Sequence, residues 1–424
     1  MTLVVQKFGG SSVADVERIR NVAKIIIREK NQGHQVVVVV SAMGKTTDSL
    51  ISLAKQICPF PSEREMDMLV STGEQVSVSL LAMALHAEGV DAVSFTGAQV
   101  GIKTDSFHTK ARILEIKGEN IFKALKKNNV VIIAGFQGID ANNNITTLGR
   151  GGSDTTAVAI AAAIKADVCD IYTDVDGVFT ADPRIVPEAF KLPTITYDEM
   201  LELAAAGAKV MHGRSIEFAK KYHVIVQVRS SFEPDKIGTF IQEEGENMEN
   251  PVITGITSNK NEAKISILGV PDKPGIAAQI FTMLANNNLN IDVIIQNASE
   301  QGMTDISCTI PREDLRKGIS TSEKIVRELG ARGFSYDEKI AKISIIGVGM
   351  KSNCGVAAVM FKAMADNKIN IRMISTSEIK VSIVIDLEQA DTAVRALHKA
   401  FRLNEPTMRE KPVSCAKKKK AKKK

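Results

Sequence analysis

The 424-residue sequence has no tryptophan, only 4 tyrosines, and no stretch in which basic and aromatic residues alternate. Nucleic-acid-binding proteins combine basic patches with aromatic side chains that stack on bases, so this scarcity argues against nucleic acid as a partner. The formal net charge of +5 does not change that conclusion, because seven lysines fall within residues 417–424. The remaining chain is close to neutral, and we expect residues 411–424 to form a disordered basic tail.

Cysteine is scarce and long apolar runs are absent. The 5 cysteines are odd in number and include no pair at CxxC spacing, which argues against a disulfide framework or a zinc site. No apolar run approaches the roughly 18 residues that span a bilayer, and the N-terminus lacks the basic and apolar regions of a signal peptide. We therefore predict a cytoplasmic protein without a membrane partner.

Strands that alternate with helices fill the first half of the chain. Residues 35–41 and 130–135 are apolar without alternation, which is typical of parallel strands covered on both faces. Further strands are predicted at 3–6, 91–95, 167–173 and 224–228. This pattern predicts an α/β domain with a parallel sheet, whose ligands bind beyond the carboxyl ends of the strands.

A glycine-rich loop at residues 149–154 precedes an alanine-rich helix and combines three glycines with Arg150, Ser153 and Asp154. Glycines let backbone N–H groups approach an anion, and the helix N-terminus adds a positive dipole end. Either Ser153 or Asp154 can cap the helix. The alternative is a tight loop without a ligand. A second glycine loop at residues 7–12 favours the anion site.

Two common phosphate motifs are excluded. Residues 44–46 read Gly-Lys-Thr like the end of a P-loop, but that motif needs a glycine at position 39, which is valine. A dinucleotide fingerprint starting at Gly149 needs glycine or alanine at position 154, which is aspartate.

Lysines beside these glycine loops predict a site for a phosphoryl donor. Lys7 ends the first strand and Lys209 ends the segment 206–209, although either could be an ordinary surface lysine. Asp154 either holds both ammonium groups in place or only caps its helix. The glycine loops contain no histidine or cysteine to act as nucleophile. A carboxylate acceptor explains that absence, since it is ionised at neutral pH and needs no general base.

The second half of the chain contains an internal repeat. Residues 264–297 match residues 342–377, and the second copy has a loop two residues longer. Each copy predicts a βαββαβ unit of ferredoxin-like type. Two tandem copies can pair edge to edge and share an effector site at the joint.

Five motifs in this order, followed by the repeat, closely resemble aspartokinases. They are KFGGSSV (7–13), SAMGKTTD (41–48), TGE (72–74), TLGRGGSDTTA (147–157) and YTDVDGVFTADPR (172–184). The resemblance implies a three-layer αβα amino-acid kinase domain, similar to carbamate kinase and with a parallel-rich central sheet, at residues 1–245. It further implies ACT domains at 262–338 and 340–410.

The resemblance also implies the activity. Aspartokinases transfer the γ-phosphoryl group of ATP, with Mg²⁺, to the side-chain carboxylate of L-aspartate and form 4-phospho-L-aspartate. This reaction is the first step toward lysine, threonine and methionine. Two alternatives stay open: another amino-acid kinase acting on glutamate or N-acetylglutamate, and a non-catalytic amino-acid sensor.

Roles for single residues follow from the matched motifs. The implied catalytic residues are Lys7, Asp154 and Lys209. The implied ATP-binding residues are Lys7, Phe8, Gly9, Gly10, Thr173, Asp174, Phe179, Thr180, Ala181, Asp182, Pro183, Arg184 and Lys209. The implied aspartate-binding residues are Ser41, Thr47, Glu74, Arg150, Gly151, Gly152 and Ser153, with Arg150 on the α-carboxylate and Glu74 on the ammonium group. Glu74 could instead be an ordinary acid in the first turn of a helix.

The repeats are implied to bind feedback effectors, L-threonine and L-lysine, and to join chains into a homodimer or an α2β2 tetramer. The implied effector residues are Asp272, Lys273, Pro274, Gly275, Ile276, Ala277, Asn290, Ile291, Asp292, Gln296, Val356, Ala357, Asn370, Ile371, Ser377 and Glu378. The second copy has Asn353-Cys354 where the first has Lys273-Pro274, which leaves open whether it binds an effector itself. Met248 is a candidate internal start for a separate regulatory subunit.

Overall fold

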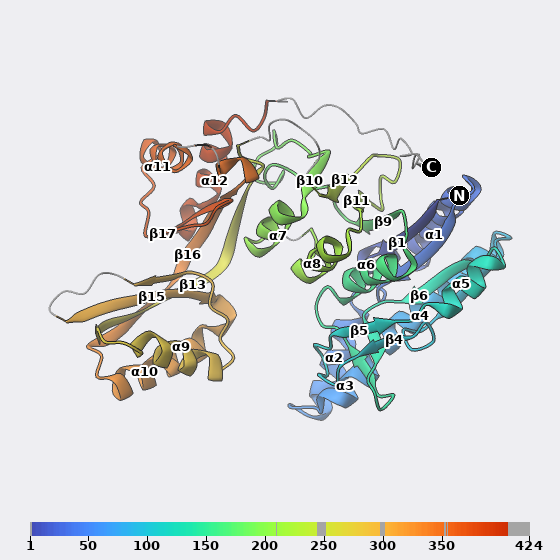
Figure 1. Cartoon of the computed structure of the whole chain (residues 1–424), viewed down its shortest axis with the longest axis horizontal. Helices are drawn as coiled ribbons and strands as arrows, with labels where there is room; N and C mark the ends of the chain where they lie inside the picture. The colour runs from blue at the N-terminus through green and yellow to red at the C-terminus, as the bar shows by residue number, and fades with distance from the viewer. Residues whose placement is uncertain are drawn as a thin grey trace, which may run out of the picture.

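The computed structural model describes residues 2–208, 210–243, 252–296, 302–351, 353 and 355–405. Two sheets dominate these residues, and Figure 1 shows them at opposite sides of the molecule. The larger sheet is built from the first 242 residues and the smaller one from residues 255–386.

The larger sheet has eight strands and is mostly parallel. In spatial order its strands are β10 (Thr194–Thr196), β12 (Thr239–Gln242), β11 (Val226–Ser230), β9 (Val168–Thr173), β1 (Leu3–Phe8), β2 (Gln35–Val40), β6 (Val130–Ala134) and β3 (Ala92–Phe95). Only the β11–β12 pair is antiparallel. Strands β1, β2, β6 and β9 therefore all end at the same edge of the sheet.

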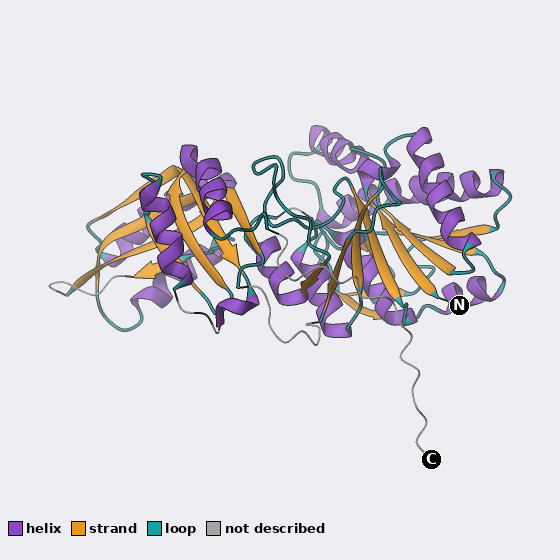
Figure 2. Cartoon of the chain, turned by 90° about the horizontal axis from the view of Figure 1, so that it is seen from above, coloured by secondary structure: helices purple, strands orange, loops and turns teal. Residues whose placement is uncertain are grey.

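Helices cover both faces of this sheet, as Figure 2 shows. Val36, Val38 and Val40 of β2 pack with α1 (Val16–Asn31) and α4 (Thr72–Ala87) on one face. Val37 and Val39 pack on the other face, which is covered by α5 (Glu119–Lys126), α6 (Gly152–Ile164), α7 (Tyr197–Ala205) and α8 (Gly213–Tyr222). The predicted three-layer α/β architecture with a parallel-rich sheet is confirmed.

We expected no segment that could span a membrane, but by length and composition alone the segment Glu63–Ala87 is long and apolar enough to do so. Its mean hydropathy is 1.4. It comprises α3 (Glu63–Val70) and α4, and half of its apolar window is buried in the protein. Val78, Leu81 and Leu85 of α4 pack in the same core as α1. Packing in the domain core accounts for its apolar composition.

A small sheet that the sequence did not predict lies beside α3. Its strands are β5 (Ile113–Ile116), β4 (Ile102–Thr104), β7 (Gln137–Ile139) and β8 (Ile145–Thr147), in that spatial order. Helix α3 packs against β8, and α2 (Thr46–Ile57) packs against α3. Strands of three or four residues carry too little periodicity to be recognised in sequence.

The smaller sheet joins the two repeats into one six-stranded sheet. Its spatial order is β14 (Ile294–Gln296), β15 (Met303–Pro311), β13 (Gly255–Pro271), β16 (Gly333–Ile346), β18 (Lys380–Asp386) and β17 (Met373–Thr376). The helices are α9 (Ile276–Asn286), α10 (Leu315–Leu329), α11 (Val356–Asp366) and α12 (Ala390–Ala400). The long antiparallel β13–β16 pair forms the joint.

The fourth strand of the second repeat comes from an unexpected part of the chain. We expected each copy to close with a strand after its second helix, but no strand follows α12 among the residues described up to 405. Residues 255–259 at the start of β13 pair instead with residues 342–346 of β16. Ile253 and Ile256 lie in the hydrophobic core of the second copy. The second copy is therefore not contiguous in sequence, because its closing strand precedes the first copy.

This arrangement predicts that Ile256→Ala, although it lies ahead of the first repeat, destabilises the second. Ile256 is only 2% exposed, so its truncation should cost about 2 to 4 kcal/mol of unfolding free energy through lost burial and a residual cavity. Hydrogen exchange should accelerate in α11 and α12 and stay unchanged in α9 and α10.

Ile237→Ala is the matched control, because this isoleucine is 67% exposed and its truncation should change stability by less than about 0.5 kcal/mol. Equal exchange in α9, α10, α11 and α12 of the Ile256 variant would contradict the assignment of residues 255–259 to the second copy.

Candidate active site

Loops from neighbouring strand ends pack backbone against backbone at the edge where β1 and β2 end. The Gly44 N–H donates a 3.0 Å hydrogen bond to the Gly10 carbonyl. A Cβ atom on Gly10 would lie 2.9 Å from the Ala42 carbonyl oxygen, so only glycine lets the two loops come this close. The Gly9 N–H faces the Tyr172 carbonyl of β9 at 3.4 Å.

Lys7 and Asp154 form a nearly buried ion pair at the centre of this edge. The Lys7 Nζ atom lies 2.5 Å from Asp154 Oδ1, and the two side chains are only 10% and 13% exposed. Lys7 comes from β1 and Asp154 from the first turn of α6. Of the two roles left open for Asp154, the structure therefore places it as the partner of a lysine.

The prediction that Ser153 or Asp154 caps α6 is wrong. The helix begins at Gly152, and its N-cap residue is Gly151, whose φ of +69° is left-handed and whose position supplies no side-chain cap. A Cβ atom at position 151 would lie 2.3 Å from the Cβ atom of His212, so glycine is required there. The first-turn N–H groups of α6 are consequently not covered by a capping side chain, which suits them to an anion.

Glu74 is a buried carboxylate in the first turn of α4 and is only 3% exposed. Its Oε1 accepts a 3.1 Å hydrogen bond from the Ala42 N–H, while its Oε2 is buried and has no hydrogen-bond partner in the part of the chain that the structure describes. Burial raises the pKa of Glu74 to about 7, against the lowering effect of its backbone hydrogen bonds. A buried, half-satisfied carboxylate beside the Ser41–Thr46 loop is suited to receive a cationic group.

The other predicted aspartate-binding residues lie in the loops after the strands or in the first helical turns that follow these loops. Ser41 follows β2 directly, and its N–H donates to the Phe8 carbonyl at 3.1 Å. Ser153 packs against the end of β6, since a Cβ atom on Gly135 would lie 2.8 Å from that of Ser153. Thr47 is half-buried in the first turn of α2. Arg150 is exposed, and no hydrogen bond or ion pair ties its guanidinium group to another residue within the described ranges.

The predicted nucleotide segment divides into two parts. Thr173 ends β9 and its hydroxyl donates to Asp174 at 3.0 Å, while Asp182 and Arg184 form an exposed ion pair at 2.7 Å. Phe179 is half-buried and forms an isolated antiparallel β-bridge with Lys191, whereas Pro183 is exposed.

Thr180 and Ala181 instead face the second repeat. Thr180 is 2% exposed, and its hydroxyl lies 3.0 Å from His398 Nε2 of α12. Ala181 is part of the hydrophobic core that contains α11 and α12. Their side chains are thus engaged at the junction between the two halves, and an ATP-binding role for them stays a prediction.

Lys209 lies outside the described residues, as do Met248, Cys354 and the tail at 411–424. The residues on either side of Lys209, Ala208 and Val210, line a pocket of about 700 Å³ between α7 and α8. Asp154 and His212 line the same pocket.

The predicted effector residues lie at matching positions of the two repeats. Gly275 and Gly355 precede α9 and α11 with φ +92° in both cases. The segments after these helices meet, because Val293 and Met373 share one buried cluster with Ile340 at the joint. Asp292 next to this cluster forms an ion pair with Lys342 of β16.

Other members of the effector set lie apart within one chain. Gln296 ends β14 and Ser377 follows β17, and these two strands are the opposite edges of the six-stranded sheet. Ile276 and Val356 are buried in the cores of their own repeats.

Three residues at this edge were not predicted. Phe136 follows β6 with a left-handed φ of +70°, and its ring would lie 2.7 Å from a Cβ atom on Gly152. Tyr172 stacks on Phe8 with ring centroids 4.6 Å apart. His212 packs against Gly151. The strand-then-glycine signal at Gly135 could have revealed Phe136, whereas His212 has no signal of this kind.

Comparison with known proteins identifies the family of this chain. Residues 2–230 match the amino acid kinase family, and residues 265–324 and 343–401 match the ACT domain. An aspartate kinase from Pseudomonas putida is 54% identical over 407 residues, which cover 96% of this chain and 99% of that protein.

Solved structures of E. coli aspartokinase III also match. Its complex with aspartate and ADP in the R-state has a TM-score of 0.78 at 27% identity and covers 94% of this chain and 99% of that one. Its complex with lysine and aspartate in the T-state has a TM-score of 0.74 at 27% identity, with the same two coverages. The glycine loops, the buried lysine–aspartate pair, the tandem repeats and these matches together show that the chain belongs to the aspartokinases of the amino acid kinase family.

Proposed function

We propose that this aspartokinase transfers the γ-phosphoryl group of ATP to the β-carboxylate of L-aspartate and forms 4-phospho-L-aspartate, the first step toward lysine, threonine and methionine. The observation that carries the proposal is the close packing of a cation-bearing glycine loop, at Lys7 to Gly10, against the loop that contacts buried Glu74. Similarity to an aspartokinase bound to aspartate and ADP supports both substrates.

Lys7 and the first turn of α6 form the phosphate side of the site. The Lys7 ammonium group, held by Asp154, and the uncapped N–H groups of α6 would neutralise charge on the transferring phosphoryl group. Lys209 is proposed as the second ammonium group. Mg²⁺ would be held chiefly by phosphate oxygens and would screen their charge.

Glu74 and Arg150 form the amino-acid side. Arg150 is proposed to bind the α-carboxylate with Ser41 and Thr47, and Glu74 to receive the ammonium group. This pairing disfavours N-acetylglutamate, because an acetylated nitrogen has no charge to pair with a buried carboxylate. The acceptor carboxylate is already ionised at neutral pH, so the site needs no general base.

Hydroxamate formation that depends on both ATP and an amino acid tests the activity. The proposal predicts turnover with aspartate and little with glutamate or N-acetylglutamate. Turnover with glutamate or N-acetylglutamate but not with aspartate would support the alternative kinases. If none of the three amino acids is turned over, the result would support a non-catalytic sensor.

Regulation is proposed to act through the two ACT repeats, with lysine, threonine or both as effectors. The T-state complex of E. coli aspartokinase III contains lysine, which supports lysine as one effector. Assembly into a homodimer or an α2β2 tetramer, the cytoplasmic location and the internal start at Met248 stay predictions from the sequence.

Arg150→Ala should raise the aspartate KM by an amount worth about 2 to 4 kcal/mol, because the substrate keeps its α-carboxylate charge throughout the reaction. The KM for ATP should stay within about twofold of wild type. Arg20→Ala, an exposed arginine on α1, is the control and should change neither value. An unchanged aspartate KM in the Arg150 variant would remove this residue from the site.

Aspartate should bind more weakly as the pH falls from about 8 to 6, because protonation of Glu74 below its pKa of about 7 removes the charge that pairs with the ammonium group. Glu74→Gln should bind aspartate weakly and lose this pH dependence. Glu88→Gln, at the exposed end of α4, is the control. Calorimetric titration of aspartate at several pH values measures the effect.

The raised pKa of Glu74 should also make the unfolding free energy of the ligand-free protein depend on pH. A folded-state pKa above the unfolded value of about 4.3 means that the folded protein holds this proton more tightly. Glu74 should therefore cost ligand-free stability as the pH rises from about 5 to 7, and Glu74→Gln should lack that loss. An identical pH profile in both proteins would contradict the raised pKa.

Gln296→Ala should relieve feedback inhibition and leave uninhibited turnover almost unchanged, because Gln296 is exposed on edge strand β14, far along the chain from the kinase loops. Activity titrated with threonine, lysine and both measures the effect. Gln279→Ala, on the exposed face of α9, should be inhibited like wild type. Equal inhibition of the Gln296 variant and wild type would refute the role.

A further inference from the structure

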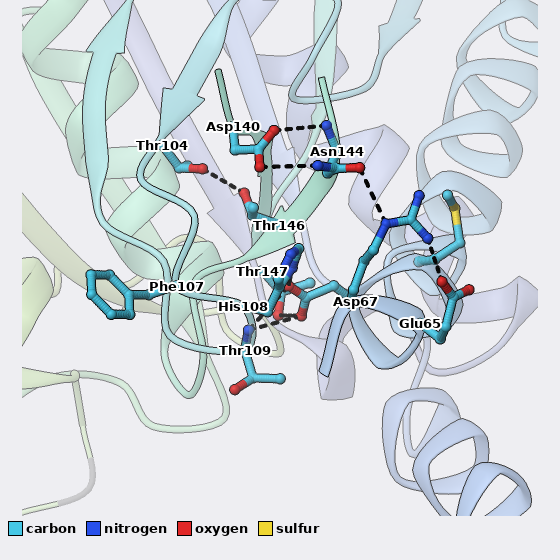
Figure 3. Close-up of polar contacts among 12 residues, drawn as sticks. Glu65, Asp67, Thr104, Phe107, His108, Thr109, Asp140, Asn144, Thr146 and Thr147 are labelled. Atoms are coloured by element: carbon cyan, nitrogen blue, oxygen red, sulfur yellow. Dashed lines mark hydrogen bonds and ion pairs between the residues drawn. The ribbon is translucent and has the colours of Figure 1, made fainter. Parts of the chain in front are cut away.

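Asp67 on α3 is a fully buried carboxylate for which the sequence suggested no role. Its Oδ1 accepts a 2.5 Å hydrogen bond from the Thr147 hydroxyl, and its Oδ2 lies 2.8 Å from His108 Nδ1. The Thr109 N–H donates to both oxygens, at 3.1 and 3.0 Å. Figure 3 shows these three residues gathered around the Asp67 carboxylate.

On one side, the backbone of Asp67 continues almost directly into the helix that carries Glu74. The Ser71 N–H donates to the Asp67 carbonyl at 3.1 Å, and α4 begins at the next residue, Thr72. Gln137 of the small sheet also donates to the Ser71 carbonyl at 2.8 Å. Asp67 and Glu74 therefore lie on one continuous, anchored segment.

On the other side, the carboxylate holds the strand that leads to Arg150. Thr147 ends β8, only three residues before Arg150. The chain between them is held again by Arg214, which donates to the Leu148 carbonyl at 2.9 Å. Gly149 has a left-handed φ of +78°, and a Cβ atom there would lie 2.9 Å from the Thr109 carbonyl oxygen.

We propose that Asp67 is a positioning residue that sets the separation between Glu74 and Arg150, and that it thereby determines affinity for the amino-acid substrate. The inference rests on the proposed roles of Glu74 and Arg150 in binding aspartate. Asp67 is fully buried, and it acts by joining α3 to both Thr147 and Thr109 through a single carboxylate. A carboxylate suits this place because it accepts every one of these hydrogen bonds, whereas an amide would direct its NH₂ group at a donor.

The selective test removes one hydroxyl without changing the shape of the side chain. Thr147→Val deletes the hydrogen bond to Asp67, and Thr147→Ser keeps it. In the full-length enzyme, Thr147→Val should raise the aspartate KM about tenfold while the KM for ATP stays within about twofold, and Thr147→Ser should stay near wild type.

Thr146→Val is the matched control on the same strand. The Thr146 hydroxyl is also buried, but it pairs with the Thr104 hydroxyl at 2.6 Å and does not contact Asp67. This variant should lose thermal stability as Thr147→Val does and keep the wild-type aspartate KM. A merely structural role for Thr147 would make the two valine variants alike in both respects.

His108→Ala provides a second measurement if Thr147→Val does not fold, because the His108 side chain is partly exposed at 17%. It should raise the aspartate KM about threefold, again without an effect on ATP. If both folded variants keep the wild-type aspartate KM while wild type phosphorylates aspartate, the positioning proposal is wrong. If wild type does not phosphorylate aspartate, the proposed function itself fails.

Discussion

The ion pair between Lys7 and Asp154 is the contact on which the rest of the kinase site depends. Both charges are almost withdrawn from water, and removal of either side chain would leave an unpaired buried charge. The pair joins the end of β1, in the middle of the large sheet, to the first turn of α6. Around it, Gly10 lets the loop after β1 pack against the loop after β2, and Gly151 lets the start of α6 pack against His212.

The two halves of the molecule are joined through the part of the kinase domain that follows β9. The Ile256 N–H donates to the Thr180 carbonyl at 2.8 Å, and Thr180 also contacts His398 of α12. Glu199 at the start of α7 accepts hydrogen bonds from the Thr254 hydroxyl and the Val348 N–H. These contacts join the segment after β9 to the second repeat, so the kinase domain and the second ACT unit share a packed junction.

Much of the fold was predictable because its signals are local. Uninterrupted valines at 36–40 predict a strand covered on both faces, and they are buried on both faces. The loop at Gly9 was predicted from strand–glycine–helix order, and the loop at Gly149 was predicted from its three glycines ahead of an alanine-rich helix. The N-cap of α6 was predicted wrongly, because the requirement for glycine at position 151 comes from His212, more than sixty residues later.

The sequence by itself determined the α/β class, the two repeats and the glycine loops of the candidate site, because periodicity, glycine loops and charged residues are local properties of the chain. Only the tertiary structure decided that Asp154 pairs with Lys7, that Thr180 faces the second repeat, and that residues 255–259 close that repeat. Each of these depends on strand order and on contacts between distant segments. An unpaired buried charge and an unpaired strand edge both cost free energy, and the folded chain avoids that cost by pairing them with distant residues. A local pattern of residues does not reveal which distant residue becomes the partner.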